Sequence, residues 1–289
     1  MKQSLLNLLF SLIAFSIAYS IALLTGLALI QQAVLIAFLI QWILFIPAYL
    51  FQTEKFYDLT GSFTYIFIVI FISYHSYAAI NVNMASILLA SCIILWAIRL
   101  GSFLFTRIHK AGEDKRFKLI KPSPTRFFMT WTLQGMWVSI CSMCALTAIA
   151  SKNGVIQNGV FYMGMLVFLT GFVLEIIADW QKSRFRKNPD NKDQFIAHGL
   201  WYYSRHPNYF GEITLWLGIS IMSFSSLSGW QYITLISPLF TYLLLVYISG
   251  VRILEISGME KWGHLEKYQE YVRTTSSLFP YFKLSNKKK

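Results

Sequence analysis

The sequence is poor in charge and in cysteine, and both shortages restrict what the protein can be. Only 13% of its 289 residues are charged, whereas 56% are hydrophobic and the mean hydropathy is +0.52. The apolar residues come in runs of about twenty, which is the length of a membrane-spanning helix. Cys92, Cys141 and Cys144 lie inside these runs and show neither a disulfide framework nor a metal-ligand spacing. We therefore expect an integral membrane protein without a metal site.

The common nucleotide-binding and hydrolase motifs are also missing. The sequence contains no GxGxxG after a strand, no GxxxxGK[ST], no HExxH and no GxSxG. These absences exclude a Rossmann cofactor site, a P-loop, a zincin and a hydrolase elbow. A nucleotide cofactor would have to be held by helix ends and loops.

The surplus of positive charge, +12, predicts topology rather than nucleic-acid binding. Lys and Arg lie between and beyond the apolar runs: seven at 107–126, six at 181–207 and eight from Arg252 onward. The connections on the opposite side carry only Lys152. By the positive-inside rule, an eight-span chain then has both termini in the cytoplasm, and in a bacterium it lies in the inner membrane.

We predict an all-α polytopic membrane protein with seven to eight transmembrane helices and a cytoplasm-facing cofactor pocket in its C-terminal half. It forms one integral membrane domain, 1–289, with N-terminal spans in 1–60 and cofactor-binding spans and loops in 84–289. The first span is read as retained, with a cleaved signal peptide as the alternative, and seven spans result if an N-terminal segment re-enters the membrane. The expected spans are 5–28, 32–51, 62–80, 84–106, 127–150, 158–180, 209–226 and 230–251.

Polar side chains are concentrated in the stretch HGLWYYSRHPNYFGE, residues 198–212, which runs directly into an apolar segment. Polar groups at a membrane surface are costly to keep, so they usually mark a site. An interfacial aromatic belt with a snorkelling Arg205 is the alternative. Because Pro207 suits a first helical turn, we expect a helix from about Pro207 that carries Asn208, Glu212 and Trp216 in one row.

A second polar row precedes this stretch. Glu175, Asp179, Lys182 and Arg186 fall at i, i+4, i+7 and i+11, and on a continuous helix they share one face. They form either a salt-bridge ladder at the membrane edge or one wall of a polar pocket. The patch FQTEKFYD, residues 51–58, adds two carboxylates and a phenol, with a solvated loop as the alternative interpretation.

These motifs resemble the steroid 5α-reductase family, particularly its bacterial branch. The resemblance covers about Met163 to the end and rests on the Asp179-Trp180 helix, GLWYYSRHPNYFGE with EITLWLG, and EKYQEYVRTTSSLFP. The RHPNY core is also similar to sterol C14 and Δ7 reductases and, more loosely, to isoprenylcysteine carboxyl methyltransferases. Glu212 favours the reductases, in which an acidic residue follows this turn.

The resemblance implies NADPH as cofactor and a hydride transfer to an activated C=C bond of a lipophilic substrate, steroid-like or another enone. The family's Gln-Glu-Leu-Pro motif is absent, and no Tyr occurs near Trp96, where the family has one. The resemblance therefore does not identify the substrate. Asp58 or Tyr57 would hydrogen-bond the substrate carbonyl, and Glu212 would help to position the nicotinamide. The residues expected to contact the cofactor are Arg99, Glu175, Asp179, Arg186, Tyr203, Arg205, His206, Asn208, Glu212 and Trp216.

Two other functions are compatible with the sequence. One is methyl transfer from S-adenosylmethionine to a lipid-linked acceptor, and the other is non-catalytic lipid binding. Clustering of polar residues at one expected membrane surface, rather than along a path across the bilayer, argues against transport. The expected partners are membrane lipid and a lipophilic substrate that enters from the bilayer. The sequence does not specify an oligomeric state.

Overall fold

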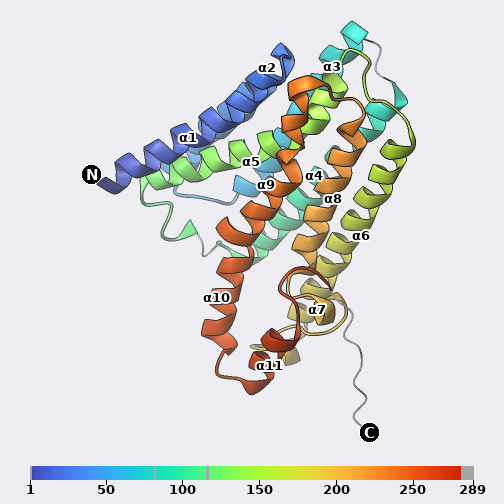
Figure 1. Cartoon of the computed structure of the whole chain (residues 1–289). Coiled ribbons are helices and arrows are strands. Elements are labelled where there is room, and N and C mark those ends of the chain that lie inside the picture. Colours follow the sequence, from blue (N-terminus) through green and yellow to red (C-terminus); the bar gives the residue numbers. More distant parts are fainter. Residues whose placement is uncertain (1, 81–82, 115–116, 281–289) are drawn as a thin grey trace. The chain divides into compact units, whose positions relative to one another are not determined.

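The computed structural model describes residues 2–80, 83–114 and 117–280, and these are helical almost throughout (Figure 1). The described ranges contain no β-strand, and one isolated bridge pairs Ser204 with Ser276. The all-α prediction is therefore confirmed. The helices are α1 (Lys2–Leu24), α2 (Ala28–Leu50), α3 (Tyr57–Ile80), α4 (Met84–Ala111), α5 (Pro124–Ala150), α6 (Gly159–Lys187), η2 (Pro189–Asn191), α7 (Leu200–Tyr203), α8 (Pro207–Phe224), η3 (Gly229–Ile236), α9 (Ser237–Leu243), η4 (Leu244–Ile248), α10 (Val251–Trp262) and α11 (Glu266–Thr274).

Seven segments of the described chain are long and apolar enough to cross a membrane, which confirms the polytopic class. Six of them belong to α1 through α6, and the seventh runs over Gly229–Trp262. The predicted segment 209–226 does form a helix, α8, but it is not among the seven. Its first turns carry Pro207, Asn208 and Glu212, which lower its hydropathy.

The last span is longer than the predicted 230–251 and is broken. It passes from η3 through α9 into a π-helical turn, η4, before α10 begins at Val251. A Cβ atom added at Gly250 would lie 2.3 Å from the Leu245 carbonyl oxygen and 2.8 Å from Cε2 of Tyr209. The chain can therefore turn here only without a side chain, and the break lies against an aromatic ring of the 198–212 stretch.

The chain divides into two compact units, which are described one at a time: Met1–Met163 with Ile219–Ser237, and Gly164–Gly218 with Pro238–Lys289. The expectation of a single domain stays a prediction. In the first unit, α1 to α4 pack against α5, and every residue of α5 from Val138 to Ala150 is buried.

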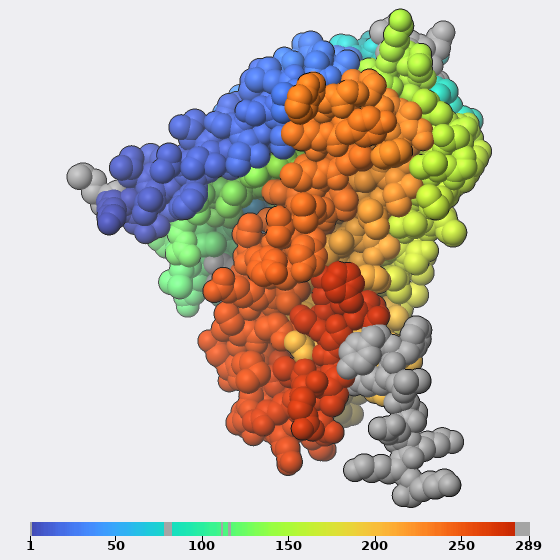
Figure 2. Space-filling model, in the orientation of Figure 1, coloured from blue at the N-terminus to red at the C-terminus, as the bar shows by residue number. Residues whose placement is uncertain are grey.

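The outer faces of α1 and α2 are apolar and exposed. Leu5, Leu12, Ile43 and Leu50 are each more than half exposed, and the blue atoms of these two helices lie at the surface in Figure 2. Such faces suit contact with acyl chains, since leaving them in water would be costly. They account for the membrane-spanning character of this unit.

In the second unit, α6 and α8 lie side by side and approach at backbone distance (Figure 1). A Cβ atom on Gly171 would lie 2.4 Å from the Leu215 nitrogen, and one on Gly218 would lie 2.4 Å from the Phe168 nitrogen. A Cβ atom on Gly211 would lie 2.7 Å from the Glu175 nitrogen. Small residues allow such close packing of membrane helices, so these glycines bring the polar rows of the two helices together.

Candidate functional site

The α6–α8 crossing assembles a buried group of acids with an amide and an indole. Glu175, Asp179 and Glu212 are 2%, 7% and 6% exposed, and Trp216 is fully buried. Asn208 donates from Nδ2 to Oδ1 of Asp179 over 3.3 Å, which joins the two rows directly. None of the three carboxylates lacks a partner, as expected for charges that are taken out of water. Sequence spacing had placed these side chains on two helix faces, and the structure brings the faces together.

The turn before α8 is held by its own side chains. Ser204 is fully buried; its hydroxyl donates to the Leu278 carbonyl over 2.8 Å and accepts from the His206 amide over 3.1 Å. Pro207 is the first residue of α8, as its missing N–H and fixed φ favour. The predicted helix start is therefore confirmed, and the turn before it is hydrogen-bonded to the C-terminal segment.

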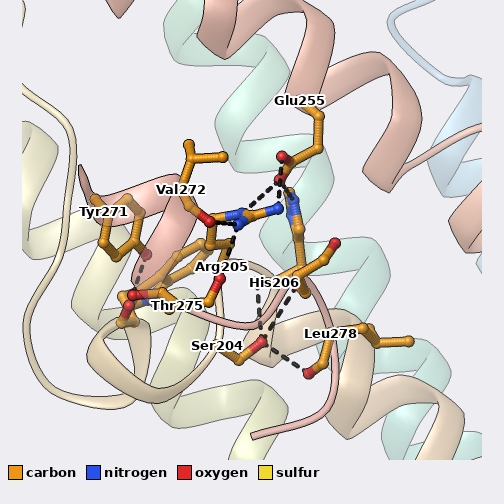
Figure 3. Close-up of polar contacts among 10 residues, drawn as sticks. Ser204, Arg205, His206, Glu255, Tyr271, Val272, Thr275 and Leu278 are labelled. Carbon is orange, nitrogen blue, oxygen red and sulfur yellow. Dashed lines mark hydrogen bonds and ion pairs between the residues drawn. The ribbon is translucent and has the colours of Figure 1, made fainter. Parts of the chain in front are cut away.

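Arg205 makes most of that connection (Figure 3). Its Nε and Nη2 donate to the two carboxylate oxygens of Glu255 over 3.1 and 2.9 Å. Its Nη1 donates to the carbonyls of Val272 and Thr275, and its amide donates to Ser276 over 2.8 Å. The cofactor contact expected of Arg205 stays a prediction, but four of the five N–H groups of this guanidinium already donate to acceptors within the protein.

His206 lies beside the same carboxylate. Its Nε2 is 2.7 Å from Oε1 of Glu255, and its ring stacks on Tyr209 with centroids 5.7 Å apart and planes at 9°. Burial lowers the pKa of His206 and outweighs the opposing effect of Glu255. Nδ1 is buried and has no hydrogen-bond partner among the described residues.

Glu255 was missed by the sequence analysis. It joins Arg205 to His206, yet it lies on α10, far from the RHPNY motif in sequence. The available signal was an acidic residue in Ile253-Leu254-Glu255-Ile256, because a lone carboxylate in an apolar run requires a partner.

The basic end of α6 packs on aromatic rings. Nζ of Lys182 lies 4.5 Å above the Trp201 ring, and the Arg184 guanidinium lies 5.3 Å from the Trp180 ring. Trp201 in turn donates from Nε1 to the Ala178 carbonyl over 3.1 Å, which fastens α7 to α6. Arg186 is exposed on the last turn, and Tyr203 is half-buried with its ring against Tyr202.

The remaining predicted residues belong to the first unit. Tyr57 donates its hydroxyl to the Thr130 carbonyl over 3.0 Å, and Asp58 lies half-buried in the first turn of α3. Glu54 accepts from Lys121 and from the Asp114 amide, so it ties two loops together.

The same unit contains an apolar cleft of about 530 Å³. Phe56 and Leu59, which flank Tyr57 and Asp58 in the chain, line it together with Ala97 and Gly101 of α4. Arg99 lies half-exposed on α4, with its guanidinium 5.5 Å from the Phe103 ring.

Comparison with known proteins places this fold and site in a family. The sequence model of the family described as "Protein of unknown function (DUF1295)" matches residues 44–275. The chain belongs to the DUF1295 family. The matched range includes the α6–α8 crossing, the RHPNY turn and Glu255.

Curated relatives of two kinds are similar to this DUF1295 chain. It is 28% identical over 123 residues to steroid 5-alpha-reductase DET2 of Arabidopsis thaliana, covering 42% of this chain and 41% of the relative. It is 25% identical over 149 residues to 3-oxo-5-alpha-steroid 4-dehydrogenase 1 of Homo sapiens, covering 52% and 49%. It is 30% identical over 115 residues to "Probable O-methyltransferase ustE" of Ustilaginoidea virens, covering 34% and 40%.

The predicted relationship to steroid 5α-reductases is confirmed by these matches. The chain spans less than half the length of each of the three relatives. No solved structure matches it significantly.

Proposed function

We propose that this protein is an NADPH-dependent membrane reductase that transfers a hydride to an activated C=C bond of a lipophilic substrate. The partly buried hydrogen bond between Asn208 and Asp179 at the α6–α8 crossing, with the buried Glu212 and Trp216 beside it on α8, carries the proposal. Two of the three relatives named above are steroid reductases or dehydrogenases by name. The same stripe on a purely lipid-facing helix would be costly and without purpose.

The side chains of the second unit suit the chemistry of a nicotinamide nucleotide. An amide and carboxylates can hydrogen-bond the nicotinamide carboxamide, for which Asn208 and Glu212 are the proposed residues, and Trp216 offers an indole for stacking. Arg186 is the proposed phosphate ligand, since an exposed guanidinium can bind phosphate through two parallel hydrogen bonds. NADPH, when bound, would supply the hydride.

Arg205 takes a different part in this proposal from the one expected from sequence. Because its guanidinium binds Glu255 and two backbone carbonyls, we assign it to holding the C-terminal segment against the start of α8. Phosphate binding then depends on Arg186 and on its neighbour Lys182. Arg99 stays a predicted cofactor contact from the first unit.

The apolar cleft is the proposed site for the body of the substrate. Its volume of about 530 Å³ is within the range of small-molecule pockets, and Phe56 and Leu59 place it next to Asp58 and Tyr57 in the chain. One of these two would hydrogen-bond the substrate carbonyl and stabilise negative charge on its oxygen. Tyr57→Phe removes a hydroxyl whose proton is already donated to the Thr130 carbonyl. Asp58→Asn keeps a hydrogen-bond donor at position 58. Comparing the reductase activities of the two variants assigns the role.

Methyl transfer is the second candidate, because the methyltransferase relative is 30% identical over 115 residues. S-adenosylmethionine would then replace NADPH as the ligand of the second unit. The two functions differ in the nucleotide that stabilises the folded protein.

Thermal unfolding of the detergent-purified protein with NADPH, NADH or S-adenosylmethionine tests the proposal. A ligand at one hundred times its Kd stabilises the folded state by about 2.7 kcal/mol. We expect this stabilisation with NADPH and none with S-adenosylmethionine. Glu212→Gln and Asn208→Ala should lose it, while the exposed Glu260→Gln should keep it as a matched control.

The possible outcomes are distinct. Stabilisation by S-adenosylmethionine alone would assign the chain to methyl transfer. Equal NADPH stabilisation of wild type, Glu212→Gln and Asn208→Ala would overturn the assignment of α8 to the cofactor, even if the protein is a reductase.

A further inference from the structure

The geometry around Glu255 fixes which ring nitrogen of His206 carries a proton. A carboxylate oxygen and an unprotonated ring nitrogen at 2.7 Å would present two lone pairs to each other, so Nε2 must donate to Oε1 of Glu255. The same carboxylate already accepts both parallel hydrogen bonds from Arg205. Its charge is therefore compensated without a second cation.

A second proton, on Nδ1, would be a buried N–H donor that meets no acceptor among the described residues, so the geometry favours the neutral imidazole. Burial holds the pKa of His206 below its ordinary value, and its side chain is 7% exposed. In a neutral ring that is protonated on Nε2, Nδ1 has a lone pair and no hydrogen. Nδ1 is thus a hydrogen-bond acceptor.

This acceptor is buried and has no partner among the described residues. A buried polar atom left in that state has lost its hydrogen bonds to water without replacing them, so native proteins rarely keep one without a reason. The ring cannot easily turn away, because Nε2 is bound to Glu255 and its face stacks on Tyr209. His206 directly precedes α8, which begins at Pro207, and is two residues before Asn208.

We infer that Glu255 is a positioning residue that holds His206 in the tautomer whose Nδ1 accepts a hydrogen bond from the carboxamide N–H of the bound nicotinamide. This inference rests on the proposed function. The carboxamide supplies the N–H donors of the nicotinamide ring, and Asn208 and Glu212, proposed to bind that ring, follow His206 within two turns of helix.

A matched ligand pair tests the hydrogen bond. The 3-acetylpyridine analogue of NADPH has a methyl group where the carboxamide has its nitrogen, so it lacks the donor. Loss of one hydrogen bond to a buried acceptor should weaken binding to the wild-type protein about tenfold. In His206→Gln, which can still donate an N–H toward Glu255 but offers no acceptor at the Nδ1 position, the two nucleotides should bind equally.

Nitrogen-15 spectra of the histidine-labelled protein provide a readout that a purely structural role would not change. The wild-type protein should show His206 protonated on Nε2 alone, and its Nδ1 resonance should shift on addition of NADPH but not of the analogue. Glu255→Gln should lose the single tautomer. The exposed His264→Gln serves as the matched control and should bind both nucleotides as wild type does.

Three results would overturn the inference: Nδ1 protonated in the wild-type protein, an Nδ1 resonance unchanged at saturating NADPH, or full discrimination retained in His206→Gln. Each of the last two presupposes NADPH binding, so it rejects the role of His206 and leaves the proposed function intact. Failure of the wild-type protein to bind NADPH would reject both.

Discussion

Because α6 and α8 cross so closely, a single methyl group added at the crossing should destabilise the fold. In Gly171→Ala, the added Cβ would lie 2.4 Å from the Leu215 nitrogen and 2.6 Å from the Gly211 carbonyl oxygen, whereas ordinary contact begins at 3.4 Å. Both opposing atoms belong to the backbone and cannot rotate aside. The two helices must therefore separate by about 1 Å, since a well-packed interface has no other slack.

The expected loss of stability follows from two opposing effects. Overpacking of this kind costs about 1–3 kcal/mol, and replacing Gly by Ala within a helix returns about 0.5–1 kcal/mol. The net destabilisation should lie between about 0 and 2.5 kcal/mol, and the middle of both ranges gives about 1 kcal/mol, or a fall in Tm of about 2–4 °C. A separation of 1 Å along this crossing would also lengthen the 3.3 Å bond between Asn208 and Asp179 beyond hydrogen-bonding range.

Thermal unfolding in detergent, with and without NADPH, measures both effects. Gly159→Ala is the matched control, because it lies on the same helix and a Cβ there would meet nothing within 4 Å. Gly171→Ala should melt lower than wild type and lose stabilisation by NADPH, while Gly159→Ala should do neither. If the two variants melt together and bind NADPH equally, the backbone contact between α6 and α8 is refuted.

Three further predictions concern polar contacts. Arg205→Lys keeps the charge but lacks the planar fork that binds the Glu255 carboxylate and two carbonyls together, so it should destabilise the fold by about 1–2 kcal/mol and expose the C-terminal segment to limited proteolysis; an unchanged digestion pattern would contradict this. Burial disfavours ionised Glu54, but hydrogen bonds from Lys121 and the Asp114 amide outweigh it and keep the pKa of Glu54 below its ordinary value. That stability is present above about pH 4.5 and is lost as the pH falls further, so Tm of wild type should fall more steeply on acidification than Tm of Glu54→Gln. Asp193→Asn breaks an exposed ion pair but keeps a residue type that tolerates the left-handed φ of 64° at this position, so it should leave Tm unchanged.

The sequence predicts the helices well because each apolar run is long enough to be recognised as a membrane-spanning helix. The first six spans appear where hydropathy places them, and α8 begins at Pro207 as the ring of proline requires. The last span was predicted too short. Its break at Gly250 lies against the Leu245 carbonyl and the ring of Tyr209, and the second contact is remote in sequence and cannot be read from local composition.

The candidate site was predictable only in part. Helical spacing put Glu175 and Asp179 on one face and Asn208 and Glu212 on another, but which faces meet depends on glycines that carry no polar signal. Arg205 was expected to contact the cofactor because the RHPNY motif resembles that of the reductases. Its acceptors include backbone carbonyls of the C-terminal segment, and no residue type in that segment reveals them.

Deuterium transfer tests the central claim most directly. The purified protein would be incubated with NADPH dideuterated at C4 of the nicotinamide and an α,β-unsaturated ketone of lipophilic character, and the product analysed by mass spectrometry. A reductase should give a saturated product that carries one deuterium at the former β-carbon, and Glu212→Gln should give none. Unlabelled product or no oxidation of NADPH across a panel of enones, together with transfer of a labelled methyl group from S-adenosylmethionine, would contradict the proposed function.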